Sequence, residues 1–164
     1  MIRKLSNRVR GQRGQALIEF VFVFPLIVVF LFSIVDFGIA IDRRIVLQHA
    51  VREGARTAAV TSDMTAIVDR TVAQSQGLLD PADVSVCYED TDGNGNPGDT
   101  GDNVRVSATF TYDFTVAITE VFNGLGASLP TGITMTPSAD MRLENTVPGA
   151  PPCAFMPVPT VSPP

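Results

Sequence analysis

Tryptophan, histidine and cysteine are scarce in this sequence. Its 164 residues include no tryptophan, one histidine and two cysteines, Cys87 and Cys153. A lone histidine, His49, neither makes a metal site nor identifies a general base. The cysteines form no CxxC motif, which argues against a redox enzyme. Because the sequence also shows no nucleophile beside a base and no phosphate-binding loop, it predicts neither an enzyme nor a cofactor.

Basic residues are scarce after the first fourteen positions. Residues 1–14 carry five basic side chains and no acid, whereas the remaining 150 carry 7 basic and 17 acidic ones. Nucleic-acid binding needs clustered Lys and Arg to neutralise phosphates, so the acidic body excludes general nucleic-acid binding. The basic N-terminal segment is typical of the cytoplasmic flank of a membrane helix.

One long apolar run follows that basic segment. Residues 16–35 contain a single charge, Glu19, and at about 1.5 Å per residue they span roughly 30 Å, the thickness of a hydrocarbon core. Pro25 lies inside the run, where membrane helices tolerate a kink. A cleaved secretory signal is the main alternative, but a signal core is shorter, about 7–15 residues. We therefore expect a transmembrane helix over residues 15–41, with a cytoplasmic N-terminus and an extracytoplasmic C-terminal domain.

The single acid at the start of the span needs an explanation. A carboxylate in a membrane helix is costly unless it is paired or reaches the interface. In one interpretation Glu19 is an interfacial acid that the positive end of the helix dipole stabilises. The other depends on Gly14 and Gln15, since a glycine, four residues and a glutamate open the apolar run.

A basic leader, a glycine, four residues, a glutamate and an apolar helix resemble the processing signal of type IV pilins and pseudopilins. Over about residues 11–60 the chain looks like the TadE family, pseudopilins of the tight-adherence (Flp pilus) secretion system. The further matching positions are Pro25-Leu26, Asp36-Phe37-Gly38 and the segment Ala50-Val51-Arg52-Glu53-Gly54-Ala55-Arg56.

The resemblance implies a minor pseudopilin that acts in assembly of a Tad/Flp-type pilus used in adhesion or secretion. A prepilin peptidase would cut after Gly14, and Glu19 would pair with the new N-terminal amine of a neighbouring pilin, since opposite charges attract strongly in a low dielectric. Pro25, Asp36 and Gly38 would belong to the assembly helix. The implied partners are this peptidase, other pilins and the bacterial inner membrane. From the residues alone, an unprocessed single-span binding or sensing module stays open.

Two further helices are expected beyond the span. Residues 42–60 continue the helical pattern, and their small residues either pack on this protein's own sheet or receive a neighbouring helix. A second helix is expected from Ser62 or Asp63 to about Gln76, ended by Gly77.

From Asp83 onward the apolar period changes to two. Strands are expected over 84–88, 104–116 and 133–144, the last interrupted by Pro137, and a short helix over 117–125. The predicted fold class is α+β, a long N-terminal helix packed on a small antiparallel sheet, which is also the pilin-like layout. The expected divisions are 1–14 leader, 15–41 span, 42–77 helices, 78–146 β domain and 147–164 proline-rich tail.

The remaining features lie in the β domain and the tail. Asp90, Asp92 and Asn94 fit the start of a calcium loop, although the expected acid at the twelfth position is missing, and a solvated hairpin loop is the alternative. Cys87 and Cys153 are expected to form a disulfide that ties down the tail. The tail itself is expected to be extended or disordered, without helix or sheet.

Overall fold

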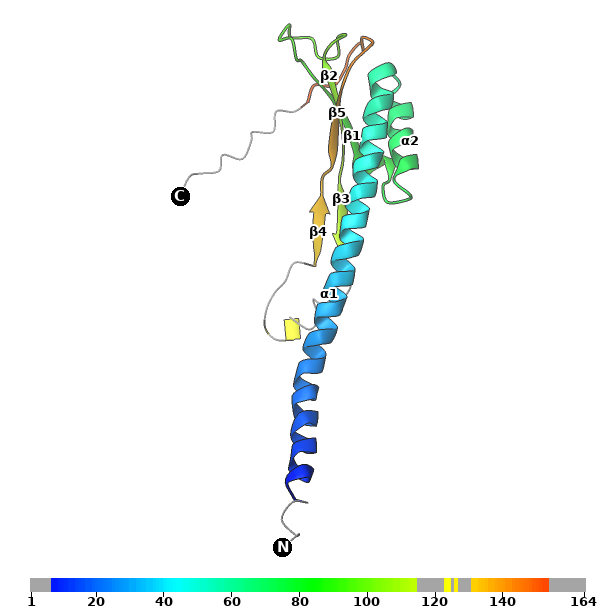
Figure 1. Ribbon diagram of the computed structural model, residues 1–164. Coiled ribbons are helices and arrows are strands. Elements are labelled where there is room, and N and C mark those ends of the chain that lie inside the picture. The colour runs from blue at the N-terminus through cyan, green and yellow to red at the C-terminus, as the bar shows by residue number, and fades with distance from the viewer. Residues whose placement is uncertain (1–6, 115–122, 125, 127–130, 154–164) are drawn as a thin grey trace, which may run out of the picture. The chain divides into compact units, whose positions relative to one another are not determined.

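The computed structural model describes residues 7–114, 123–124, 126 and 131–153. Its first element is α1, a helix from Asn7 to Val60 that continues through Pro25 (Figure 1). The expected transmembrane and juxtamembrane helices are therefore one helix. The chain divides into two compact units, residues 1–40 with 113–132 and residues 41–112 with 133–164. The boundary between the units falls within α1.

The second helix, α2, runs from Met64 to Gln74. Asp63 caps it, because its carboxylate accepts the N–H groups of Thr65 at 3.0 Å and Ala66 at 3.3 Å. The chain then leaves the helix through two residues with positive φ, Gln76 at 56° and Gly77 at 80°. This confirms the predicted capping acid, while the helix ends two residues earlier than expected.

Five short strands follow. A 3₁₀ turn, Pro81–Asp83, leads into β1 (Val84–Glu89), which pairs antiparallel with β2 (Asn103–Ala108). The last strand, β5 (Ser138–Arg142), pairs antiparallel with the other side of β2, so the sheet order is β1-β2-β5. Two more strands, β3 (Phe110–Asp113) and β4 (Gly132–Met135), form a separate two-stranded sheet.

The two long strands expected over 104–116 and 133–144 are each divided in two. The divisions lie opposite each other, at Thr109 and beside Pro137, whose carbonyl accepts the N–H of Ala108. Proline has no N–H to return, so the ladder is interrupted there. Ser107 pairs with Ser138, and the hydroxyl groups of Thr111 and Thr134 lie 3.3 Å apart, so the same register continues beyond the break. The helix expected over 117–125 falls outside the described residues, apart from 123 and 124.

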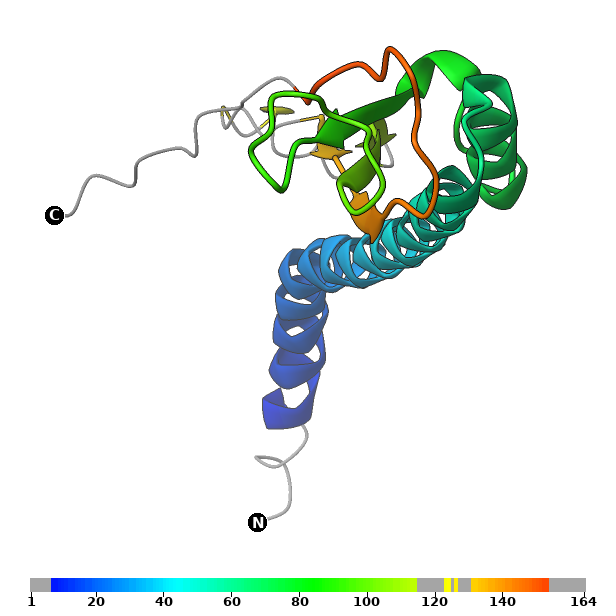
Figure 2. The same ribbon diagram turned by 90° about the horizontal axis from the view of Figure 1, so that it is seen from above.

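The hydrophobic core lies between the C-terminal part of α1, α2 and one face of the three-stranded sheet. Figure 2, seen from above, shows the strands beside this part of α1 and α2 next to it. The fully buried side chains of α1 include Leu47 and Val51, and those of β2 include Val104 and Val106. The alternation of buried and half-buried residues along β2 confirms the predicted amphipathic strand. The α+β class with a long N-terminal helix is confirmed as well.

Candidate assembly helix and its polar surroundings

Residues 17–32 of α1 carry apolar side chains apart from Glu19, and most of these side chains are exposed in the described part of the chain. Among the described residues, one helix is long and apolar enough to cross a membrane, with a mean hydropathy of 2.8 in its most apolar window and none of that window buried. Its exposed large side chains include Leu17, Ile18, Phe20, Val21, Phe22, Val23, Phe24, Leu26, Ile27, Phe30, Leu31 and Phe32. A helix that is apolar all round suits lipid or other apolar helices, not water.

The residues of the expected processing signal lie at the start of this exposed stretch. Gly14, Gln15 and Glu19 are all exposed on α1. Among the side chains that the structure describes, Glu19 has no cationic partner in an ion pair. An acid at the beginning of an apolar span therefore has no charge compensation from the described side chains of its own chain, and an uncompensated carboxylate is costly in a membrane helix.

The other expected assembly residues have different surroundings. Pro25 lies within the exposed helix. Asp36 is only 2% exposed, whereas a Cβ added at Gly38 would meet no atom within 4 Å. Glu19 and Asp36 are separated by about 25 Å along the axis, at 1.5 Å per residue. The structure therefore does not bring the predicted residues into one site but distributes them along the helix, with Asp36 buried and the others exposed.

The small residues of α1 beyond the span pack within the protein. Ala50, Ala55 and Ala58 are buried, and a Cβ at Gly54 would overlap the side-chain hydroxyl of Thr71 on α2. The Thr71 hydroxyl donates to the carbonyl of Ile67 at 2.9 Å. Of the two possibilities that the sequence left open, these residues serve packing against the protein's own elements.

The opposite face of the same part of α1 is exposed and positively charged. Ile45, His49, Arg52 and Arg56 lie three or four positions apart and are all exposed. Beside them, Glu53 accepts a 2.7 Å hydrogen bond from Arg70 of α2. This hydrogen bond is the main reason why the pKa of Glu53 lies below its ordinary value, and the charges of Arg70 and Arg56 add to the effect.

The loop between β1 and β2 gathers acids. Asp90, Asp92 and Asp102 each place a carboxylate oxygen within 4.8 Å of the others. Asp90 accepts the N–H groups of Gly95 at 2.7 Å and Gly93 at 2.8 Å, and these hydrogen bonds, that of Gly95 first, lower its pKa.

Asn94 and Asp102, two other residues of this loop, also form hydrogen bonds with the chain itself. Asn94 donates its amide N–H to Asp92 at 2.9 Å, and its amide oxygen accepts the N–H of Asn96 at 2.8 Å. Asp102 is buried and accepts the N–H groups of Thr91, Gly98 and Asp99 at 2.9–3.1 Å. These hydrogen bonds explain how a loop that contains several negative charges keeps its conformation. The calcium site stays a prediction.

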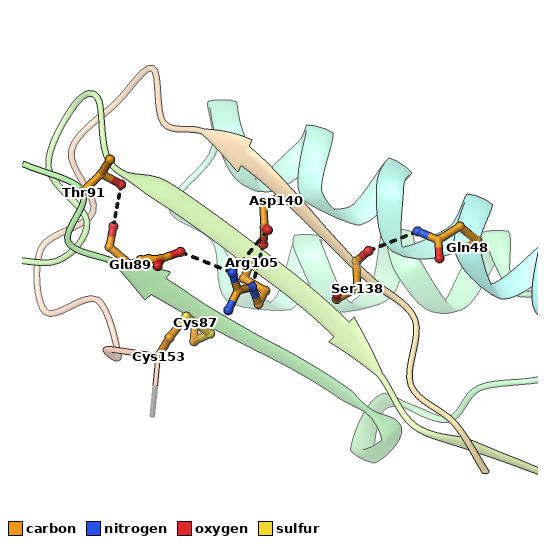
Figure 3. Close-up of polar contacts among 8 residues, drawn as sticks. All are labelled: Gln48, Cys87, Glu89, Thr91, Arg105, Ser138, Asp140 and Cys153. Atoms are coloured by element: carbon orange, nitrogen blue, oxygen red, sulfur yellow. Dashed lines mark hydrogen bonds and ion pairs between the residues drawn. A yellow bond between two sulfur atoms is a disulfide. The ribbon is translucent and has the colours of Figure 1, made fainter. Parts of the chain in front are cut away.

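The segment that follows β5 is joined to β1 by a disulfide and by backbone hydrogen bonds. Figure 3 shows the disulfide that joins Cys87 of β1 to Cys153, with an S–S distance of 2.00 Å. Beside it, the N–H of Tyr88 donates to Pro151 and the N–H of Cys153 donates to Tyr88, both at 2.9 Å. We call residues 143–153 the C-terminal strap.

The strap also reaches α1 and the core. The N–H of Glu144 donates to Ala59 at 2.9 Å and the side chain of Asn145 donates to Val60 at 3.0 Å, which satisfies carbonyls at the end of α1. Val147 and Ala150 are buried. Residues 147–153 contain no helix or strand, as expected for the tail, but they are held against β1, where an isolated parallel bridge joins Pro152 to Tyr88.

Tyr88 lies beneath the strap at the centre of this arrangement. Its side chain is fully buried, burial raises the pKa of its hydroxyl, and that hydroxyl has no hydrogen-bond partner among the described residues. The outer face of the sheet is polar by contrast. There Arg105 pairs with Asp140 at 2.7 Å and Glu89 at 3.3 Å, and the bond to Asp140 raises its pKa (Figure 3). Such exposed pairs contribute little stability.

Sequence reasoning missed three features of this region. One is the capping role of Asp102, although an acid that directly precedes a strand in a glycine-rich loop is a signal for backbone capping. Gly54 was expected to serve close packing, but its contact with Thr71 carries no signal in either segment. The burial of Val147 had no signal beyond its apolar side chain.

Comparison with known proteins gives one match. Residues 14–56 match the family model described as TadE-like protein. No curated protein and no solved structure matches the chain. The match confirms the resemblance seen in the sequence, and it covers the exposed apolar stretch together with the part of α1 that packs on the core. It supports a pilin-like, membrane-anchored protein associated with a Tad pilus.

Proposed function

We propose, from the match of residues 14–56 to TadE-like proteins, that this chain is a minor pseudopilin that assembles through α1 into or beneath a Tad/Flp-type pilus. The observation that carries the proposal is the change from exposed to buried side chains along α1 within that segment. Its first half exposes large apolar side chains on all sides, while its second half is packed into a folded domain.

This arrangement supports two successive environments for the same helix. Before assembly, the apolar half spans the inner membrane, with the basic leader on the cytoplasmic side and the folded domain outside. After assembly, the same surface contacts the helices of neighbouring pilins. Both environments are apolar, so transfer between them exposes no large hydrophobic surface to water.

Processing is the second part of the proposal. Prepilin peptidase cleaves after Gly14, so that Gln15 becomes the first residue of the mature chain. Glu19, which is exposed and has no ion-pair partner among the described side chains, then pairs with the N-terminal amine of a neighbouring subunit. Each charge removes the cost of leaving the other unpaired in an apolar bundle.

The alternative function is a permanently anchored binding or sensing module. It shares the membrane span and the folded domain, but it requires neither cleavage after Gly14 nor a charge at Glu19. These two residues therefore separate the two functions, whereas the structure of the domain does not.

The experiment measures the intact mass of the protein from membranes of its native host, with the host's peptidase present. We expect a chain that begins at Gln15 for the unaltered protein and a full-length chain for Gly14→Asp, because a side chain with charge blocks the site of cleavage. Glu19→Ala should still insert and be cleaved, but pilus assembly, counted by electron microscopy, should fall severely.

Glu19→Asp is the matched control, since it keeps the charge and should retain more assembly than Glu19→Ala. A full-length chain in the unaltered host would contradict processing. Normal piliation by Glu19→Ala would favour an interfacial acid and the anchored module.

A further inference from the structure

Beyond the apolar span, α1 keeps one face open to solvent. On the covered side Leu47, Val51 and Ala55 are completely buried. On the open side Arg52 and Arg56 follow His49 at helical spacing, and we call the two arginines the cationic face. Ile45, one turn before His49, is 64% exposed. Two arginines near an exposed isoleucine resemble the polar rim of an interface beside part of its apolar core.

The charges of the chain are strongly segregated around this face. Four of the seven basic residues after position 14 lie between residues 43 and 56, whereas thirteen of the seventeen acids follow Val60. Arg70 and Arg105 are engaged in ion pairs with their own chain. Among the described residues, Arg52 and Arg56 have no such partner.

The acids gather on another surface of the same domain. Asp90, Asp92 and Asp99 lie in the loop between β1 and β2, which we call the acidic loop, and Asp92 is the most open of them. The hydrogen bonds that Asp90 and Asp92 accept come from neutral N–H groups. These bonds shape the loop without bringing a positive charge to Asp90 or Asp92.

We propose that the cationic face of α1 binds the acidic loop of a second copy of this chain; this inference rests on the proposed assembly through α1. Copies that pack side by side through their apolar helices bring acidic domains next to one another, and like charges at close range repel. A cationic face on one copy against an acidic loop on the next converts that repulsion into attraction.

The proposed contact joins two different surfaces of the same chain. A heterologous contact of this kind leaves one cationic face and one acidic loop free at the ends of any row of copies, so it can extend in one direction. Electrostatic complementarity of exposed charges also sets the register and the rate of encounter more than the affinity. The contact would therefore position neighbouring domains while the apolar helices hold the copies together.

The test is a charge-reversal cycle on the full-length chain in lipid nanodiscs or mild detergent, with self-association measured by analytical ultracentrifugation. We expect Arg52→Glu/Arg56→Glu and Asp92→Lys/Asp99→Lys each to weaken self-association at least tenfold. Combining all four changes should restore it, because the charges are exchanged and not removed. Self-association of the unaltered chain should weaken as salt rises, since these charges are exposed.

Asp69→Lys is the matched control, an exposed acid on α2 that lies outside the acidic loop, and it should leave self-association unchanged. Circular dichroism checks that each variant is folded, and Arg52→Gln/Arg56→Gln replaces the reversal if that variant unfolds. Weakening by the arginine variants alone, or no recovery in the fourfold variant, overturns the assignment of the acidic loop.

Failure of this inference is distinguishable from failure of the proposed function. If the charge variants self-associate normally while the host still produces a chain starting at Gln15 and Glu19→Ala still fails to assemble, only the inferred contact is wrong. A chain that is never cleaved contradicts the proposed function directly.

Discussion

The two halves of α1 differ in the size and the burial of their side chains, although they belong to one helix. From Leu17 to Phe32 large aliphatic and aromatic side chains are exposed. From Leu47 to Ala59 the buried positions are mostly alanines and Gly54, with Leu47 and Val51 the largest buried side chains. The first half carries large side chains on every side. The second half carries few large side chains, and its small residues lie where other elements pack closely against the helix.

This difference follows from the environments expected for the two halves, hydrocarbon for the first and water for the second. In hydrocarbon a helix needs only apolar side chains, because lipid accepts a large group in any direction. In water the helix must bury one face against a folded domain, and close-packed interiors leave no room for a side chain that does not fit. The same α-helix can therefore serve as a membrane span and as the central support of a domain, provided that its side chains change in size between the halves.

The largest expected effect comes from the disulfide, which lies entirely on the domain side of this comparison. Cys87→Ser/Cys153→Ser opens a loop with a sequence separation of 66, and chain entropy then predicts a loss of about 4 kcal/mol. Urea unfolding of the full-length chain in detergent, followed by circular dichroism, measures the loss. The helical signal of the span should survive in urea, and an unchanged midpoint for the domain would show that the strap holds without its covalent bond.

An intermediate effect is expected from Gly→Ala substitutions on either side of the boundary between the two units, which lies between Ala40 and Ile41. Gly54→Ala should destabilise the domain by about 1–3 kcal/mol, because overpacking against the buried Thr71 outweighs the gain in helix propensity. Gly38→Ala is the matched control and should be neutral or slightly stabilising, since open space surrounds it. Equal effects at the two positions in urea unfolding would contradict the difference between the halves.

The smallest effect is expected at the pair Glu53–Arg70, which lies at the exposed border of the packed half. The pKa of Glu53 is lowered in the folded protein, so the pair stabilises the fold above the ordinary glutamate pKa. This contribution is lost as the pH falls through the lowered value. The midpoint of thermal unfolding for the unaltered chain should therefore drop slightly more on acidification than that of Glu53→Gln. Identical pH profiles would assign no stability to the pair.

Much of the fold was predictable because its signals are local. Asp63 as a cap, the period-two pattern of β2 and the effect of Pro137 each depend on a few neighbouring residues. The division at Thr109 had no signal within its own strand, because it results from the missing N–H of Pro137 on the strand opposite.

The candidate site divides in the same way. Gly14 and Glu19 were identified from their spacing, and the exposure of the helix around them follows from its composition. The burial of Asp36 was not predictable, nor was the capture of three backbone N–H groups by Asp102, because both depend on segments that are distant in sequence.

An apolar run of sufficient length, the basic segment before it and the spacing of one glycine and one acid were enough to predict a membrane span and a maturation signal. These properties need no partner within the chain, since transfer into a bilayer depends on the composition and length of the segment itself. The roles of Gly54, Tyr88 and the strap were decided only by tertiary structure. Each depends on which atoms of a distant segment occupy the adjoining space, and close packing makes that a property of the whole fold.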